Sequence, residues 1–221
     1  MLVLGISFSN DAAAAIVSDE GVIAAVSEER FARIKHYAGW PEAAIDFCLS
    51  RAGCALGDLD AVAFAWNPAI HLSVPLARYR AWRHQSEFLA VVPNHLLPRL
   101  TNLGDVNYVE QRFAFANRAS PLPIYYVTHH LAHAASCFFV SPFDDAAILT
   151  FDGYGERTST LFADGSGTTI RDLGRVEYPH SLGSLYAAVT AYLGFKPNNA
   201  EGKIMALASY GTPSLTADFR K

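Results

Sequence analysis

The residues best suited to chemistry in this chain are three histidines within one short run, Thr128–Ser136, which reads THHLAHAAS. His129 and His133 are four positions apart, so on a helix their imidazoles lie one above the other on the same face. Two imidazoles in that arrangement can bind one metal ion, as in the helical motif of zinc proteases. Those proteases place a Glu directly after the first His, whereas this chain has His130 there. The spacing therefore predicts a metal site and disfavours peptide hydrolysis.

A purely structural interpretation competes with the metal site, since histidines can also cap a buried helix and satisfy local hydrogen bonds. We favour the metal site because the pair stands where a strand-like run, 123–127, meets a helix-like run, 134–140. His130 lies on another side of that helix and is expected to contact substrate or backbone. Two ligands do not complete a site, so a carboxylate must come from another part of the fold.

Asp152 is the best candidate for this acidic ligand. It follows a strand-like run, 146–151, and opens the acidic, glycine-rich turn DGYGE at 152–156. Gly153 and Gly155 allow the backbone to approach an ion or a phosphate closely. An ordinary Asp-Gly turn is the competing interpretation, and the two histidines favour the ligand. The turn is too short for a P-loop and lacks its lysine.

The composition limits the class of protein. Hydrophobic residues make up 51% of the 221 positions and charged residues 17%, which favours a packed core over disorder. The formal net charge is -4 and no basic block is present, so neither a nucleic-acid nor a membrane surface is expected. The three cysteines are scattered, which indicates a reducing compartment. With no signal peptide and no run of roughly 18 apolar residues, we expect a cytoplasmic protein.

The order of apolar and turn residues predicts an α/β fold that begins with three antiparallel strands. These strands cover 2–7, 12–17 and 22–27, with Asp11 at the first turn and Gly21 at the second. An amphipathic helix and a fourth strand follow, and residues 67–120 are expected to form a helical, loop-rich insertion that covers a substrate. The helix is predicted at 41–52 and the fourth strand at 59–66.

The pattern restarts after Pro142 and repeats the N-terminal plan of strand, Asp at a turn, strand, hairpin and strand. Such an internal repeat predicts two similar lobes, 1–141 and 142–221, with a ligand cleft between them. Glu201 and Lys203 are expected in a polar loop before a last short helix. The second lobe lacks copies of the later elements of the first, so we expect a fragment of a longer protein that forms homodimers.

Several motifs together resemble the N-terminal part of the O-carbamoyltransferases that modify nodulation factors and antibiotics such as tobramycin and cephalosporin precursors. The resemblance covers nearly the whole chain in the order of that family. The matching motifs are Ser27–Phe31 with Arg33, Lys35 and His36; Thr128–Ser136; Phe151–Glu156; Ser181–Gly183; and Asn199–Gly211.

The resemblance implies an actin/Hsp70-like (ribonuclease-H-like) fold of two lobes, the second incomplete here. It implies a divalent metal, expected to be iron, held by His129, His133 and Asp152. It also implies ATP as co-substrate and carbamoyl phosphate as the carbamoyl source, joined in a carbamoyl-adenylate. The carbamoyl group would then pass to a hydroxyl of a small molecule, such as a sugar or another natural product. The alternative is a non-catalytic, actin-like module that binds nucleotide or metal.

The resemblance also assigns roles to single residues. Lys35 is expected to contact the acceptor, and Ser181, Leu182 and Gly183 are expected to hold the adenylate. The family usually has His-Asp in the first turn, whereas this chain has Asn10 and Asp11. If that histidine accepts the proton of the acceptor, Asp11 or another group must do so here. The expected catalytic residues are Asn10, Asp11 and His130, and further substrate contacts are expected from Gly153, Gly155, Glu156, Glu201 and Lys203.

Overall fold

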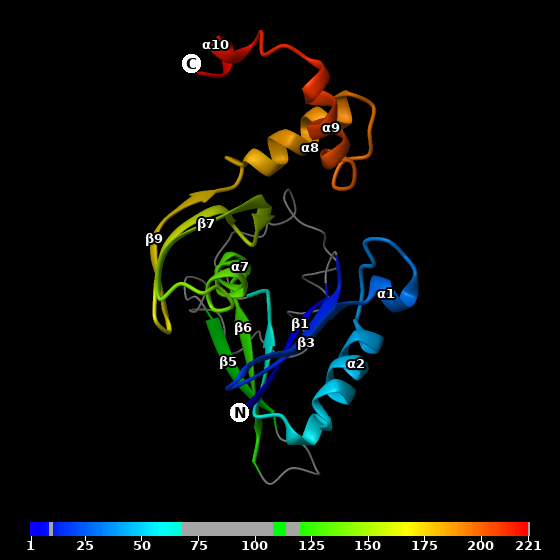
Figure 1. The fold of residues 1–221 in the computed structure, drawn as a ribbon, viewed down its shortest axis with the longest axis vertical. Helices are drawn as coiled ribbons and strands as arrows, with labels where there is room; N and C mark the ends of the chain where they lie inside the picture. The colour runs from blue at the N-terminus through cyan, green and yellow to red at the C-terminus, as the bar shows by residue number, and fades with distance from the viewer. Residues whose placement is uncertain (9–10, 68–107, 114–119, 221) are drawn as a thin grey trace, which may run out of the picture.

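A computed structural model describes residues 1–8, 11–67, 108–113 and 120–220. It contains a six-stranded sheet of order β3-β2-β1-β4-β6-β5 and a separate three-stranded sheet of order β7-β8-β9. Figure 1 shows helix α7 between the two sheets and helix α2 beside the first one. The chain is therefore mixed α/β, as the sequence predicted.

The first sheet begins with the predicted antiparallel meander. Strands β1 (Leu2–Ser7), β2 (Ala13–Ser18) and β3 (Gly21–Ser27) pair in sequence order, with Leu4 opposite Ile16. Gly21 has a φ of 126°, a value that side chains disfavour, which explains the glycine at this turn. The meander places Asp11 just beyond the end of β1.

Three parallel strands give this sheet a common edge. Strands β4 (Ala61–Phe64) and β6 (Leu122–Val127) run parallel to β1, in the order β1-β4-β6. Their carboxyl ends therefore meet at one side of the sheet, the side where ligands collect in open α/β sheets. The segments that follow β1 and β6 carry Asp11 and the three histidines of α7.

The expected insertion at 67–120 is partly corrected. Strand β5 (Tyr108–Phe113) pairs antiparallel with β6, so this part of the region is extended and not helical. Its hydrogen bonds to β6 outweigh the helix-like spacing that suggested otherwise. The remaining positions, 68–107 and 114–119, lie outside the described residues.

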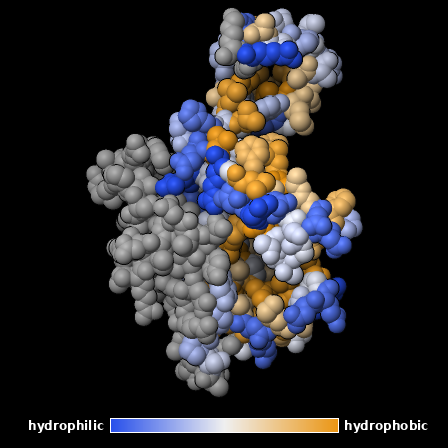
Figure 2. All heavy atoms as spheres, turned by 90° about the vertical axis from the view of Figure 1, so that its left-hand side faces the viewer, coloured by the Kyte–Doolittle hydropathy of each residue, from blue (hydrophilic) through white to orange (hydrophobic). Residues whose placement is uncertain are grey.

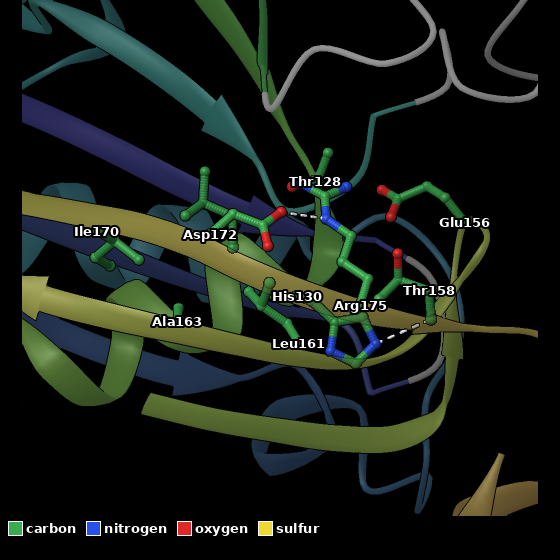
Figure 3. Close-up of a pocket in the computed structure, with 10 residues that line it drawn as sticks. Thr128, His130, Glu156, Thr158, Leu161, Ala163, Ile170, Asp172 and Arg175 are labelled. Carbon is green, nitrogen blue, oxygen red and sulfur yellow. Dashed lines mark hydrogen bonds and ion pairs between the residues drawn. The ribbon is translucent and has the colours of Figure 1, made fainter. Parts of the chain in front are cut away.

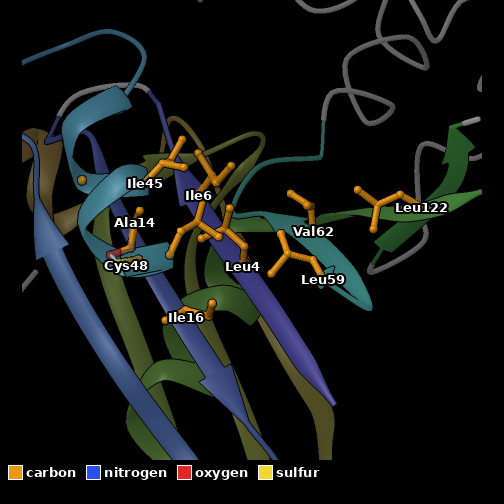
Figure 4. Close-up of a cluster of buried hydrophobic side chains, with 11 residues drawn as sticks. Leu4, Ile6, Ala14, Ile16, Ile45, Cys48, Leu59, Val62 and Leu122 are labelled. Carbon is orange, nitrogen blue, oxygen red and sulfur yellow. Dashed lines mark hydrogen bonds between the residues drawn. The ribbon is translucent and has the colours of Figure 1, made fainter. Parts of the chain in front are cut away.

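Helix α2 (Glu42–Ala52) covers one face of the meander. Leu4, Ile16 and Cys48 are fully buried between them, as Figure 4 shows. The buried Glu28 accepts hydrogen bonds from the backbone N–H groups of Ala43 (3.3 Å) and Ala44 (2.8 Å), at the start of this helix. Its carboxylate thus stabilises the positive end of the helix. The short helices α1 (Glu29–Ala32) and η1 (Leu56–Asp58) flank α2 in the chain.

The second sheet packs against α7 (His129–Phe138). Strands β7 (Asp145–Gly155), β8 (Thr158–Ser166) and β9 (Thr169–Glu177) are antiparallel, as predicted. Ala134 and Phe138 of the helix pack on the apolar face of the sheet formed by Ile148, Leu161 and Ala163. The sequence placed α7 in the first lobe, and its packing joins it to the sheet of the second.

The end of β7 differs from the prediction. A turn was expected from Asp152 to Glu156, but the strand continues to Gly155, with irregular pairing between Phe151 and Gly155. Asp152 therefore lies within an irregular strand segment and not at a turn equivalent to that of Asp11. A bulge of this kind redirects a side chain without ending the strand.

The C-terminal part is helical and lies at the top of Figure 1. It contains α8 (Leu182–Tyr192), α9 (Glu201–Leu207), η2 (Ala208–Tyr210) and α10 (Thr216–Phe219). Glu201 and Lys203, expected in a loop, form the first turn of α9. An acidic residue in a first turn suits the helix dipole, which accounts for the earlier helix start.

Apolar side chains are exposed on this helical part, among them Leu185, Tyr186 and Tyr192 of α8. Figure 2 shows apolar surface in the uppermost part of the molecule and again in the part directly beneath. Apolar surface of this kind marks a contact with another segment or another protein, and the homodimer stays a prediction. In the described part of the chain, no helix is both long enough and apolar enough to cross a membrane.

Candidate metal centre

Helix α7 begins directly after β6, at the sheet edge where the carboxyl ends of β1, β4 and β6 meet. Thr128 is extended and buried, and its carbonyl accepts the N–H of Ala132 to start the helix at His129. Strand β7 lies beside this helix. His129 and His133 therefore come from consecutive turns of α7, and Asp152 comes from the irregular end of β7.

The side chains of these three residues converge on one point. His129 Nε2 lies 2.7 Å from Asp152 Oδ2 and 3.0 Å from His133 Nε2. His133 Nε2 lies 3.5 Å from the same carboxylate oxygen. The three potential ligand atoms all lie within 4.8 Å of one another. The proximity predicted from the sequence is thus present.

Hydrogen bonds alone cannot satisfy this arrangement. If His129 Nε2 donates its proton to Asp152, it has no lone pair to accept a proton from His133, and the reverse also holds. A cation accepts all three lone pairs at once, and two nitrogens bound 2.0–2.1 Å from one ion lie about 3 Å apart. The donor set of two imidazoles and one carboxylate therefore fits a divalent transition metal.

The second oxygen of Asp152 points to the same conclusion. Its Oδ1 is buried and has no hydrogen-bond partner among the described residues, although His130 Nε2 lies 3.3 Å away. Leaving a buried carboxylate oxygen unpaired is costly unless a cation compensates it. The carboxylate is thus arranged for a ligand that the surrounding protein groups do not supply.

The pKa of Asp152 keeps this carboxylate ionised. Burial is the largest single influence and raises the pKa, but the interactions with His129, His130 and His133 together outweigh it. The pKa of Asp152 consequently lies well below its ordinary value. The group is therefore negatively charged at neutral pH, the form in which a carboxylate binds a metal.

His130 lies behind the cluster and is almost fully buried. Its Nδ1 lies 2.7 Å from the Thr150 hydroxyl, and its Nε2 donates to the carbonyl of Thr158 at 2.9 Å. Figure 3 shows the His130–Thr158 contact in a small pocket beside α7. Of the two contacts foreseen for His130, the one with the backbone is present. This ring ties α7 to β7 and β8, so its position favours a structural role over catalysis.

Two residues of the DGYGE run position His129. A Cβ added to Gly155 would lie 2.3 Å from the His129 ring, so the helix approaches the strand this closely only because position 155 is glycine. The buried Glu156 carboxylate accepts the backbone N–H of His129 at 3.1 Å and that of Asn67 at 2.8 Å. Glu156 thus holds the start of α7, and its predicted substrate contact stays a prediction.

The predicted adenylate segment packs against the metal-ligand candidate itself. The Ser181 hydroxyl lies 3.0 Å from the carbonyl of Asp152 and 2.6 Å from that of Gly153. A Cβ on Gly183 would lie 2.4 Å from the Asp152 carbonyl group, so this residue too must be glycine. The neighbouring Leu182 side chain is exposed. The start of α8 therefore fixes the backbone from which the Asp152 carboxylate projects.

Replacing Ser181 with Ala should weaken both helix α8 and the metal site. The Ser181 oxygen caps α8 by accepting the N–H of Ser184 at 3.0 Å, a contact of about 1 kcal/mol. Because the same hydroxyl also binds the backbone carbonyls of Asp152 and Gly153, metal affinity should fall about 10-fold or more. Thermal melting and metal titration check this, with Ser209→Ala as a control. Unchanged metal affinity in Ser181→Ala would show that α8 does not position the ligand.

Other predicted site residues lie elsewhere. Lys35 is exposed after α1, and Lys203 is exposed in α9. Glu201 accepts the backbone N–H of Asn198 at 2.6 Å. Within the described ranges, these three make no hydrogen bond or ion pair with the metal-ligand candidates. Asn10 lies outside the described residues, and Asp11 contacts His36, a residue to which the sequence reasoning gave no role of its own.

Thr150 and Thr158 were also missed, although the sequence carries a signal for the first. In a strand, alternate residues face the same side, so Ile148, Thr150 and Asp152 share a face. The buried Ile148 packs against α7, and the same alternation turns Thr150 toward His130. The contact of Thr158 is made by its backbone carbonyl, which no residue type reveals.

Comparisons with known proteins identify the family of this chain. The family model described as carbamoyltransferase N-terminus matches residues 2–220. An uncharacterized protein of Synechocystis sp. is 39% identical over 214 residues, which cover 96% of this chain and 35% of that protein.

Two nodulation proteins are also similar. Nodulation protein NolNO of Sinorhizobium fredii is 38% identical over 213 residues, covering 96% of this chain and 29% of that protein. Nodulation protein NolO of Bradyrhizobium diazoefficiens is 40% identical over 87 residues, covering 39% of this chain and 16% of that protein. The chain thus spans about a third of the length of the relatives that it matches almost throughout. It belongs to the carbamoyltransferase family, and it corresponds to the N-terminal part of that family's proteins.

Proposed function

We propose that this chain forms the metal-holding part of an ATP-dependent O-carbamoyltransferase with an actin-like fold. The observation that carries the proposal is the convergence of His129, His133 and Asp152 on one point, with a buried carboxylate oxygen left unpaired. The family membership supplies the reaction class, and the antiparallel triplets in two separate sheets support the two-lobe arrangement.

We assign a separate role in this reaction to each group of residues. His129, His133 and Asp152 would hold a divalent metal, for which we propose iron. When bound, such an ion acts as a Lewis acid that polarises an oxygen of the bound carbamoyl donor. Glu156, Gly155 and Ser181 fix the ligands, because they hold the start of α7, the approach of α7 to β7 and the backbone of Asp152. The donor is a carbamoyl-adenylate made from carbamoyl phosphate and ATP, and the acceptor is a hydroxyl of a small molecule.

The complete gene product tests this proposal. It should release pyrophosphate from ATP when carbamoyl phosphate is supplied, and it should transfer labelled carbamoyl to a hydroxyl acceptor. Metal analysis of the purified protein should give about one divalent ion per chain. A protein that binds the metal but neither releases pyrophosphate nor transfers carbamoyl would instead be the non-catalytic binding module. The one observation in favour of that module is Asn10, which stands where the resembling family has His.

Replacing Lys35 with Ala should impair the acceptor and spare the donor. Lys35 is exposed in the segment that follows α1, on the same segment as His36, which contacts Asp11. Loss of the charged hydrogen bond that Lys35 is proposed to make with the acceptor, which is about 1.5–3 kcal/mol, should raise the KM for the acceptor at least about 10-fold, with pyrophosphate release unchanged. Paired assays of both steps measure this, with Lys35→Arg as the control that retains the positive charge. A loss of pyrophosphate release in Lys35→Ala would contradict the assignment.

A further inference from the structure

A second imidazole–carboxylate pair lies outside the metal centre. His36 Nδ1 is 2.8 Å from Asp11 Oδ1, although the two residues are 25 positions apart in the chain. The backbone N–H of His36 donates to Glu29 at 3.2 Å, and the backbone N–H of Ala12 donates to the carbonyl of Tyr37 at 2.9 Å. The bond from Ala12 to Tyr37 holds the two segments together, and the bond from His36 to Glu29 fixes the turn that carries His36.

The contact with Asp11 decides the form of the His36 ring. A carboxylate can only accept a hydrogen bond, so Nδ1 must carry the proton that it donates to Asp11. In the neutral ring, Nε2 then has a free lone pair. This is the tautomer that a general base requires, and the same carboxylate stabilises the ring once Nε2 has taken up a proton.

The second ring nitrogen of His36 is unpaired among the residues that the structure describes. Its Nε2 is buried and makes no hydrogen bond in the described part of the chain, while the side chain as a whole is 34% exposed. Buried polar atoms are nearly always paired, and an unpaired one costs about 1–3 kcal/mol. The described protein groups therefore leave this lone pair available for a hydrogen-bond donor such as an acceptor hydroxyl.

The pair lies at the same sheet edge as the metal centre. Asp11 follows β1 and His129 follows β6, and only β4 separates these two parallel strands. Two strand spacings are roughly 10 Å, a span that a small molecule can bridge. Trp40, which follows His36, lies 6.4 Å from Phe8 and 6.2 Å from Phe64 between ring centroids. This aromatic cluster fixes the segment of His36 against the carboxyl ends of β1 and β4.

We infer that His36 is the catalytic base of carbamoyl transfer in this protein, with Asp11 as its positioning residue. The inference rests on the proposed function. It adds to it a proton acceptor, because this chain has Asn10 where the family that it resembles usually has a histidine. His36 Nε2 takes the proton of the acceptor hydroxyl as the acceptor oxygen bonds to the carbamoyl carbon. The bond between that carbon and the phosphate oxygen of the adenylate breaks, and its electron pair leaves with the nucleoside monophosphate.

The experiment compares two nucleophiles on the complete gene product, supplied with ATP and labelled carbamoyl phosphate. Hydroxylamine needs no base to capture an activated carbamoyl group, whereas the hydroxyl probes, methyl glycosides and tobramycin, do need one. His36→Gln should lose at least about 100-fold in transfer to the hydroxyl probes, with transfer to hydroxylamine within about twofold of wild type. Asp11→Asn should lower kcat for the hydroxyl probe that reacts fastest and leave its KM unchanged. His180→Gln, the same change at an exposed histidine, is the matched control.

The outcomes distinguish a failure of the role of His36 from a failure of the proposed carbamoyltransferase function. If the wild-type ratio of hydroxyl to hydroxylamine transfer is no higher than that of His36→Gln, the base is not His36, and the carbamoyltransferase itself stands. If wild type carbamoylates neither nucleophile, the proposed function fails and the role of His36 fails with it. Equal losses of both transfers in His36→Gln would show a structural defect and also overturn the assignment.

Discussion

Replacing His133 with Ala is expected to abolish metal binding and carbamoyl transfer while leaving the fold intact. The His133 side chain is 51% exposed, so its removal creates little cavity and should change the free energy of unfolding by no more than about 0.5 kcal/mol. The variant keeps only His129 and Asp152 as ligands, too few to hold an ion in a fixed geometry. Metal affinity and transfer should each fall by at least about 100-fold, since even groups that only support ligands contribute 10–100-fold.

Metal titration, metal analysis and thermal melting measure this prediction on one preparation. His180→Ala, which removes an exposed histidine outside the cluster, serves as the control. Full metal content or full transfer activity in His133→Ala would exclude the proposed ligand set. A large loss of stability without added metal would instead indicate that the histidine pair serves the fold.

Replacing Gly155 with Ala should have the second-largest effect, through packing alone. The new Cβ would lie 2.3–2.4 Å from three atoms of His129, closer than van der Waals contact allows, so α7 or β7 must move. Such overpacking costs about 1–3 kcal/mol, which lowers Tm by several degrees in a chain of this size. Because His129 is itself a candidate ligand, metal affinity should fall together with stability.

The matched control is Gly174→Ala in β9, where an added Cβ meets nothing within 4 Å. Melting curves and metal titrations of the two variants isolate the steric effect from the loss of a glycine in a strand. A Gly155→Ala protein that melts and binds metal like Gly174→Ala would show that His129 can relax without losing its position.

The candidate ligands could be identified from the sequence because their evidence is local. The spacing of His129 and His133 places two imidazoles on one helix face whatever the rest of the fold does. The meander of β1, β2 and β3 could also be predicted, since the alternation of apolar and polar residues and the turn at Gly21 are short-range signals. The family motifs likewise depend on residue types in order along the chain, and the family model confirms the family that they indicated.

Contacts between residues far apart in the chain could not be predicted from the sequence. The contacts of Glu156 with the start of α7 and of Ser181 with the strand of Asp152 were not predicted, while their expected contacts with substrate stay predictions. Glu201 was placed in a loop, although it begins helix α9. A carboxylate or hydroxyl has the same sequence signature whether it meets a ligand or a distant N–H group, so only the partner distinguishes them.

The sequence by itself determined the α/β class, the antiparallel triplets and the histidine pair, because helical and strand periodicity act over a few residues. The tertiary structure alone decided that β7 continues past Asp152 and that α8 packs onto it. It also decided that His36 reaches Asp11 across 25 residues. Those contacts arise where the carboxyl ends of parallel strands and the second sheet come together, and the free energy of that packing, not local propensity, selects them.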